Sequence, residues 1–235
     1  MRELRIIHLF PDLLNLYGEK GNILVIKKRC KKRDINVTVR EYKINDDIDI
    51  KDADIIILGG GSENDVQKAY KKLTGAKETL KEYTENGGVL LSIASGYEMI
   101  GKSFSLGSET LEGLSLGSFY SEGNEKRLID NVKLETEFGE VIGFTNHSAR
   151  FYLDEGAKAF GTVVNGYGNN EIDKSEGYLC NNIFATNLHG PLLPKNPNIA
   201  DEIIKRALLR KYGEQGAFPP IPSELSEQAK ASIEF

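Results

Sequence analysis

A strand, a sharp turn and a short helix follow one another around Ala94, in a pattern that could carry nucleophilic chemistry. The run Val89–Ile93 is predicted to be a strand, and Tyr97–Gly101 a short helical stretch. In hydrolases a turn of this kind lifts a nucleophile above the end of the sheet. The turn crowds the backbone, so it needs small residues two positions before and after, and Ser92 and Gly96 are small. By this register the nucleophile position is Ala94, whose methyl group cannot attack a substrate.

Backbone N–H groups beside the turn could stabilise a developing oxyanion. One expected donor is the N–H of Ser95, and the second is expected from Gly60 or Gly61, at the end of the neighbouring strand. The glycine run is not a phosphate-binding loop, because it lacks the lysine of the G-x-x-x-x-G-K-[ST] motif. The pattern is also compatible with an ordinary strand-to-helix connection that carries no chemistry.

His189 directly follows a predicted late strand, Ile183–Leu188. Functional residues of open parallel sheets collect just beyond the carboxyl ends of the strands. A histidine there could act as a general base toward a nucleophile on a neighbouring turn. The alternative is a surface or core histidine. We interpret His147 as a hydrogen-bonding loop residue rather than a site residue, and His8 as a structural residue within a strand.

The elements that would position these residues alternate between strands and helices, which predicts a three-layer α/β fold with a mostly parallel central sheet and helices on both faces. Three consecutive isoleucines suit a strand that is buried on both faces. Ser62 and Asp65 form a capping-box start for a helix that breaks near Gly75. The other expected strands and helices are Leu4–Phe10, Asn22–Arg33, Ile35–Tyr42 (edge-like), Ala53–Leu58 and Ala76–Asn86.

The middle and the end of the chain have different patterns. Three strand candidates, Leu128–Leu134, Glu140–Phe144 and Ala159–Val164, predict a small antiparallel extension. A helix is expected from Asn196 to Gly213. We therefore divide the chain into a domain of residues 1–212 and an appendage of residues 213–235. The appendage holds a proline-rich connector and a helix with Leu225, Ala229 and Ile233 on one face, either docked on its own domain or bound to a partner.

Composition limits the classes of function. The 235 residues carry a net charge of −5, with 40% hydrophobic and 28% charged residues, as in an ordinary globular protein. No basic cluster could follow a phosphate backbone, so nucleic acid is not an expected partner. We find no targeting segment and no apolar run of bilayer length, which predicts a cytoplasmic protein without membrane insertion. Cys30 and Cys180 have no CxxC spacing, so we expect buried or half-buried thiols and neither a metal site nor a cofactor.

Six motifs together resemble the class I glutamine amidotransferases of the cobyric-acid-synthase type, over roughly residues 1–212. Each motif is weak alone, but their order and spacing are specific. They are Leu14-Asn15-Leu16-Tyr17-Gly18 with Gly21-Asn22, Gly59-Gly60-Gly61-Ser62, Ile93-Ala94-Ser95-Gly96-Tyr97-Glu98, Gly143-Phe144-Thr145-Asn146-His147, Gly166-Tyr167-Gly168-Asn169-Asn170 and His189-Gly190-Pro191-Leu192-Leu193-Pro194-Lys195-Asn196.

The resemblance implies hydrolysis of L-glutamine to glutamate and ammonia by a Cys–His pair. Within the class, the motifs are most similar to glutaminase subunits that supply ammonia to a MurT-like, Mur-ligase-type synthetase, which uses ATP to amidate the D-glutamate of lipid II in peptidoglycan synthesis. Carried over by position, the cysteine falls on Ala94 and the histidine on His189. The arginine that holds the substrate falls on Arg127, and the oxyanion donors fall on Gly60 or Gly61 and on Ser95.

Three departures from the family pattern lie at the turn, where the family reads Ile-Cys-Gly-Gly-Tyr-Gln. This chain has Ala94 for the cysteine, Ser95 for a glycine and Glu98 for the glutamine. Three hypotheses follow: a glutaminase subunit inactivated by Ala94, a naturally non-catalytic scaffold or glutamine-binding subunit, or a serine hydrolase that uses Ser95 or Ser92. Both serines are off the register of the turn. Pro191 stands where many class I relatives carry an acid, so His189 must be oriented by other means.

Overall fold

A six-stranded, mostly parallel sheet forms the centre of the computed structural model, which describes residues 2–214 and 216–235. Its order is β13-β14-β4-β3-β1-β2, and only β13 runs antiparallel to its neighbour. The bounds are β1 Arg2–Leu9, β2 Ile35–Tyr42, β3 Ile55–Leu58, β4 Val89–Ile93, β13 Tyr178–Cys180 and β14 Ile183–Thr186. All four residues of β3 are buried, as its isoleucine run predicts.

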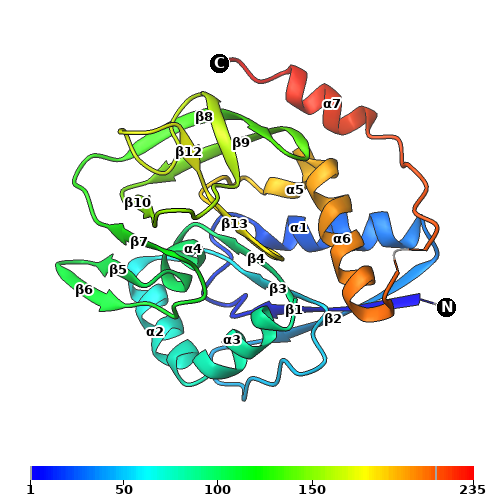
Figure 1. Ribbon diagram of the computed structural model, residues 1–235, viewed down its shortest axis with the longest axis horizontal. Helices are drawn as coiled ribbons and strands as arrows, with labels where there is room; N and C mark the ends of the chain where they lie inside the picture. The colour runs from blue at the N-terminus through cyan, green and yellow to red at the C-terminus, as the bar shows by residue number, and fades with distance from the viewer. Residues whose placement is uncertain (1, 215) are drawn as a thin grey trace.

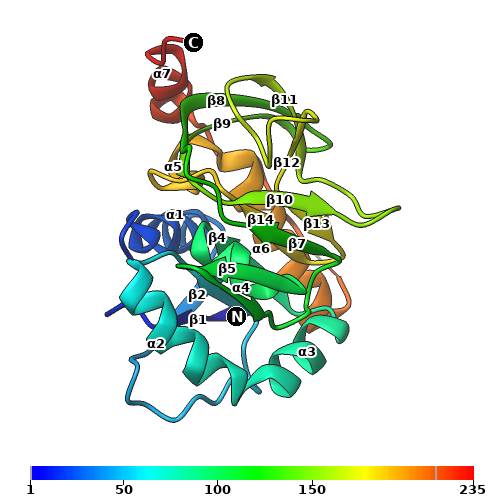
Figure 2. The same ribbon diagram turned by 90° about the vertical axis from the view of Figure 1, so that its left-hand side faces the viewer.

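Helices cover both faces of this sheet, which confirms the predicted three layers. Figure 2 shows α2 (Glu63–Thr74) and α3 (Lys77–Glu85) below the sheet and α1 (Glu19–Lys31) above it. Alternate strand residues point to opposite faces. One apolar core therefore joins the sheet to α1 and α6 (Pro197–Tyr212), and a second joins it to α2 and α3.

The strand order places a crevice at the carboxyl end of the sheet. From β1 the chain passes first to β2 on one side and then to β3 on the other, so the order reverses between β1 and β3. Open α/β sheets bind ligands outside the carboxyl ends of the strands at such a switch point. The segment after β1, the glycine run after β3 and the turn after β4 meet there.

The chain between β4 and β14 forms antiparallel structure, as predicted. A four-stranded sheet of order β12-β11-β8-β9 lies above α1 and α5 (Figure 1). The hairpin β5-β6 and the long-range pair β7-β10 were not predicted, and neither was the edge strand β13. These strands are only two to nine residues long, and several have no clear apolar alternation. Their bounds are β5 Ser103–Leu106, β6 Glu109–Glu112, β7 Phe119–Glu122, β8 Leu128–Thr136, β9 Gly139–His147, β10 Arg150–Leu153, β11 Gly161–Asn165 and β12 Ser175–Glu176.

Most predicted boundaries agree with the structure to within a few residues. The N-cap of α2 is Ser62, whose hydroxyl accepts a hydrogen bond from the Asp65 N–H. The helix after the turn, α4 (Ser95–Ile100), begins two residues earlier than predicted, and the short α5 (Leu192–Lys195) was not predicted. No helix in residues 2–214 and 216–235 is both long and apolar enough to cross a membrane.

Two smaller expectations need correction. Cys180 is exposed, because it ends the antiparallel edge strand β13, whereas Cys30 is buried on α1 as expected. The helix of the appendage, α7 (Glu224–Ala231), lies against the domain, but the predicted apolar face is not its docking face. Leu225 is 76% exposed, and the hydroxyl of Ser226 instead donates to the Pro194 carbonyl oxygen at 2.8 Å.

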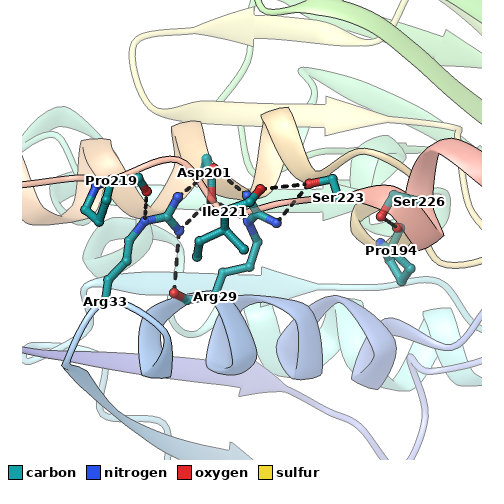
Figure 3. A network of polar contacts seen from close by, with 8 residues as sticks. All are labelled: Arg29, Arg33, Pro194, Asp201, Pro219, Ile221, Ser223 and Ser226. Atoms are coloured by element: carbon teal, nitrogen blue, oxygen red, sulfur yellow. Dashed lines mark hydrogen bonds and ion pairs between the residues drawn. The ribbon is translucent and has the colours of Figure 1, made fainter.

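An ion cluster beneath the connector fixes α1 against α6 (Figure 3). Arg29 on α1 and Arg33, just after the end of α1, both donate to the Asp201 carboxylate on α6, at 2.5 to 2.9 Å. The connector covers the cluster, since Arg33 also donates to the Pro219 carbonyl oxygen at 3.0 Å and lies 3.7 Å above the centre of the Phe218 ring. Burial opposes ionisation of Asp201, but the hydrogen bonds from the two arginines outweigh it and hold the pKa of this carboxyl below its usual range.

We expect Asp201→Asn to lower the free energy of unfolding by about 3 to 5 kcal/mol, because two buried guanidinium groups lose the carboxylate that they share. Urea unfolding at pH 7 measures this loss. Because the folded-state pKa is depressed, the stabilisation is complete above the ordinary aspartate pKa of about 3.9 and disappears as the pH falls below it. The control is Asp52→Asn, which removes an exposed ion pair with Arg5 and should cost no more than about 1 kcal/mol. Equal losses in the two variants would contradict the assignment.

Candidate functional site

The backbone at Ala94 has the strained conformation that the sequence pattern predicts for a nucleophile turn. Its φ of 53° and ψ of −120° are rarely adopted by a residue with a side chain. The chain leaves β4 here, and α4 begins at the next residue. Gly96 allows the turn to form, because a Cβ atom at this position would lie 2.6 Å from the Leu58 carbonyl oxygen. The need for a small residue two positions after Ala94 is thereby confirmed.

The glycine run after β3 packs tightly against the segment that follows β1. A Cβ atom at Gly60 would lie 2.9 Å from the Tyr17 ring and 3.0 Å from the Ala94 Cβ atom. At Gly59 it would meet the Glu19 side chain at 2.6 Å. Gly60 therefore lies between Tyr17 and Ala94, and only glycine fits there. Burial raises the pKa of Glu19 to about 7, against the opposing effect of nearby backbone N–H groups that include the one of Gly60.

His189 is buried, with 6% of its surface exposed. Its ring stacks on the Tyr17 ring with centroids 4.1 Å apart, and the Phe144 ring meets it edge-on at 5.5 Å. The Nε2 atom has no hydrogen-bond partner within residues 2–214 and 216–235. Burial, reinforced by the positive charges of Lys195 and Arg127, lowers the pKa of His189 to about 4. The imidazole is therefore neutral at pH 7.

A cavity of about 630 Å³ opens beside the turn. Its walls come from three parts of the chain: the segment after β1, the ends of β3 and β4, and the antiparallel insertion. Its lining includes Tyr17, Gly61, Ala94, Ser95, Glu98 and Arg127. This volume lies in the range of small-molecule sites.

Two opposite charges face this cavity from different elements. Arg127, just before β8, donates to both the side-chain and the backbone oxygen of Asn146, each at 2.7 Å. These two bonds hold its guanidinium at the cavity wall. Glu98 on α4 is half-buried, and burial raises the pKa of its carboxyl to about 7, partly offset by the charge of Arg127. The cavity therefore offers a cation and a titratable acid to a ligand.

The predicted site residues gather at one end of the sheet. Gly61, Ala94, Ser95 and Arg127 line the cavity, and Gly60 lies directly beside Ala94. His189 is not among the lining residues, because Tyr17 covers one face of its ring. One contact was not anticipated: the Gly61 N–H donates to the Ser95 hydroxyl at 3.4 Å.

The other two histidines differ in position. His147 ends β9, lines the cavity and bonds through Nδ1 to the Ala149 carbonyl oxygen at 2.7 Å. The expected hydrogen bonding agrees with this contact, but the expectation of a loop position was wrong, because His147 is the last residue of a strand and borders the cavity. His8 is fully buried within β1, consistent with a structural residue. In the part of the chain that the structure describes, no cluster of three or more His, Cys, Asp or Glu side chains could hold a metal ion.

Sequence reasoning missed a buried carboxyl that supports the site. Glu176 in β12 accepts hydrogen bonds from the Thr186 hydroxyl at 2.9 Å and the Asn187 N–H at 2.8 Å. The Thr186 carbonyl oxygen in turn accepts from the Ala94 N–H at 3.0 Å. Glu176 thus fixes the end of β14, which connects the turn to His189. It lies in a short segment without periodicity, so no local pattern indicates this role.

Comparisons with known proteins agree with this geometry. Residues 5–197 match the CobB/CobQ-like glutamine amidotransferase domain. Over 232 residues the chain is 40% identical to the Staphylococcus aureus protein named lipid II isoglutaminyl synthase (glutamine-hydrolyzing) subunit GatD, covering 98% of this chain and 93% of that protein. The subunit of the same name from Streptococcus pneumoniae is 35% identical over 230 residues, with 96% and 88% covered. A crystal structure of a glutamine amidotransferase shares the fold at a TM-score of 0.58 and 16% identity, covering 86% of this chain and 98% of that chain.

We expect Ala94→Gly to raise the free energy of unfolding by about 1 kcal/mol, because glycine adopts the backbone conformation at this turn without strain. Denaturant unfolding of the purified variant measures the change. The matched control is Ala69→Gly in α2, where the backbone is helical, and there the same substitution should destabilise the protein by about 1 kcal/mol or more. A loss of stability at position 94 would show that the turn is not strained.

Proposed function

The chain belongs to the CobB/CobQ-like glutamine amidotransferase family, and from this we propose that it is the glutaminase subunit of a lipid II isoglutaminyl synthase. In this proposal the fold is built to hydrolyse L-glutamine to glutamate and ammonia, and Ala94 makes the present chain silent in hydrolysis. The observation that carries the proposal is the strained turn at Ala94, which opens into a cavity that Arg127 also lines.

The chemistry assigned to this site needs a thiol at position 94. A thiolate there would attack the carboxamide carbon of glutamine and form a thioester as ammonia leaves, and water would then release glutamate. The neutral His189 imidazole is the expected base that accepts the thiol proton. The N–H of Ser95 is the expected donor to the oxyanion, with Gly60 or Gly61 as the second. Without the sulfur no covalent step can begin.

Arg127 is the residue proposed to bind the α-carboxylate of glutamine. Its guanidinium is held at the cavity wall by two bonds to Asn146, which leaves the other N–H groups free for a planar carboxylate. Glu98 lies in the same wall and could pair with the α-ammonium group.

The proposed partner is a MurT-like synthetase of the Mur-ligase type, which would bring the ATP site and receive the ammonia in the cytoplasm. The names of the two bacterial relatives describe a subunit, and therefore support a larger complex. We keep the division into a domain of residues 1–212 and an appendage of residues 213–235 as part of the proposal.

A naturally non-catalytic, glutamine-binding subunit remains the second candidate, and one contact favours it. The Ser95 hydroxyl accepts the hydrogen bond of the Gly61 N–H, one of the expected oxyanion donors. Ser95 thus departs from the family at a second position important for hydrolysis. The serine-hydrolase alternative has less support, because Ser92 is fully buried within β4 and does not line the cavity. Ser95 lines the cavity, but it lies one residue after the strained position of the turn.

We expect the Ala94 protein to release no glutamate from L-glutamine and Ala94→Cys to restore release, because loss of a nucleophile costs on the order of 10⁶ in kcat. A glutamate assay with and without a synthetase partner measures both. Adding Ser95→Gly to Ala94→Cys should raise kcat further, by up to about 100-fold, if Ser95 occupies an oxyanion donor. Steady turnover by the Ala94 protein would contradict the assignment of position 94. Silence of both cysteine variants would favour the non-catalytic subunit.

We also expect Arg127→Ala to weaken glutamine binding to the Ala94 protein by about 10- to 100-fold, as for a lost hydrogen bond to a charged group of 1.5 to 3 kcal/mol. Isothermal titration calorimetry measures the affinity without any turnover. Lys126→Ala is the matched control, because Lys126 pairs with Glu171 and does not line the cavity. Unchanged affinity in Arg127→Ala would remove this residue from the site.

A further inference from the structure

We propose that the outer face of α1, together with the groove between α1 and α7, binds the surface of a membrane that contains anionic lipids. The choice of a membrane rests on the proposed function, because a subunit that serves the amidation of lipid II works beside a substrate whose lipid tail lies in a bilayer. The binding itself can be measured on the full Ala94 chain without glutamine hydrolysis, so the two proposals can fail separately.

The outer face of α1 is cationic over the second half of the helix. The opposite, apolar side, which includes Ile26 and Cys30, is buried in the core. Residues four apart on a helix lie on the same face. The outer face carries four exposed lysines, Lys27, Lys28, Lys31 and Lys32, of which the last is the C-cap. Cations near a helix C-terminus also stabilise the helix dipole, and this is the competing explanation for them.

An apolar groove of about 400 Å³ continues this face between α1 and α7. Lys28 and Lys32 border the groove, and its apolar walls are Val25, Pro194, Pro197, Ile221, Pro222 and Leu225. Leu225 is 76% exposed at the groove, and Leu24, one turn before Lys28 on α1, is 64% exposed. Exposed leucines flanked by lysines are typical of a surface that lies in the interface between a bilayer and water.

This face lies away from the candidate site. Because β1 and β2 are parallel, α1 between them runs back from the carboxyl end of the sheet to its opposite end (Figure 1). The four lysines therefore lie at the end of α1 that is farther from the cavity. Figure 2 shows α1 and α7 along the same side of the molecule. Among the described residues, the groove and the cavity share no lining residue, so a membrane on this face leaves the cavity open to glutamine.

The charges of this face complement an anionic bilayer. The groove and the neighbouring hollow beside β2 are lined by the four lysines and by two acids, Asp34 and Glu224, so positive charge prevails there. The whole chain has a net charge of −5, so the rest of its surface is on balance repelled. Each lysine close to an anionic bilayer strengthens binding by about fivefold. The four lysines together would hold the chain reversibly and decide which of its sides meets the membrane.

The experiment is sedimentation of the full Ala94 chain with vesicles of phosphatidylcholine, either alone or mixed with an equal part of phosphatidylglycerol. Binding is expected only to the mixed vesicles, and it should disappear at about 1 M salt, where the screening length is only about 3 Å. Changing all four lysines of the face to glutamine should weaken binding by on the order of several hundred-fold. Leu24→Ser combined with Leu225→Ser should weaken it by about tenfold, because two apolar contacts with the bilayer are lost.

Matched controls separate this face from net charge and from general hydrophobicity. The first control replaces four lysines of α2 and α3, on the opposite side of the sheet, by glutamine: Lys68, Lys71, Lys72 and Lys81. It removes the same charge and should change the affinity for the mixed vesicles little. Ile172→Ser, at a residue that is 82% exposed on the antiparallel insertion, is the control for the two leucines. Both lysine variants should keep the glutamine affinity of the parent, since none of these lysines lines the cavity.

Four results would overturn the inference. No binding to the mixed vesicles would leave the lysines with the helix dipole alone, and equal losses in the two lysine variants would show that net charge governs binding. Binding to poly-L-glutamate but not to vesicles would assign the face to an acidic protein. Loss of vesicle binding when a synthetase subunit is bound would place α1 in the interface between subunits. If Ala94→Cys hydrolyses no glutamine while the vesicle results hold, only the proposed function fails.

Discussion

The close approach of three backbone segments at the carboxyl end of the sheet is the constraint on which the site depends. The glycine run after β3 touches the segment after β1 on one side and the turn after β4 on the other, at distances that exclude any Cβ atom at Gly59, Gly60 or Gly96. Protein interiors are packed as densely as organic crystals, so a shift of one of these segments would displace the segments that it touches. The backbone strain at Ala94 can persist here because the surrounding structure leaves the turn no alternative.

The buried sheet provides the rigidity that this arrangement needs. Two apolar cores, one on each face, hold β1, β3, β4 and β14 in a parallel register, so their carboxyl ends lie in a row. The antiparallel insertion between β4 and β14 then closes the cavity from above with Arg127 and His147. The sheet thus fixes the turn, and the insertion supplies groups that a ligand would meet.

Burial is the main cause of the pKa shifts of the titratable side chains at this end of the sheet. It lowers the pKa of His189 to about 4, and it raises the pKa values of Glu19, Glu98 and Glu176 to about 7. Burial thus moves the pKa values of the three glutamates toward the working pH, as is common at functional sites, whereas it moves that of His189 away from it.

The sequence by itself determined most of the local strands and helices and the position of the sharp turn at Ala94. The isoleucine run of β3, the capping residue Ser62 and the small residues around Ala94 act through their immediate neighbours, so their consequences can be seen in a short window. The β13 edge strand, the two additional strand pairs and the docking face of α7 were not predicted, because long-range pairing selects them. Three contacts were decided by the tertiary structure alone. They are the stack of Tyr17 on His189, the hydrogen bonds of Glu176 to the end of β14, and the hydrogen bond from the Gly61 N–H to the Ser95 hydroxyl. These contacts join residues that lie far apart in the chain, and only the packing of the folded sheet and insertion decides which of them meet.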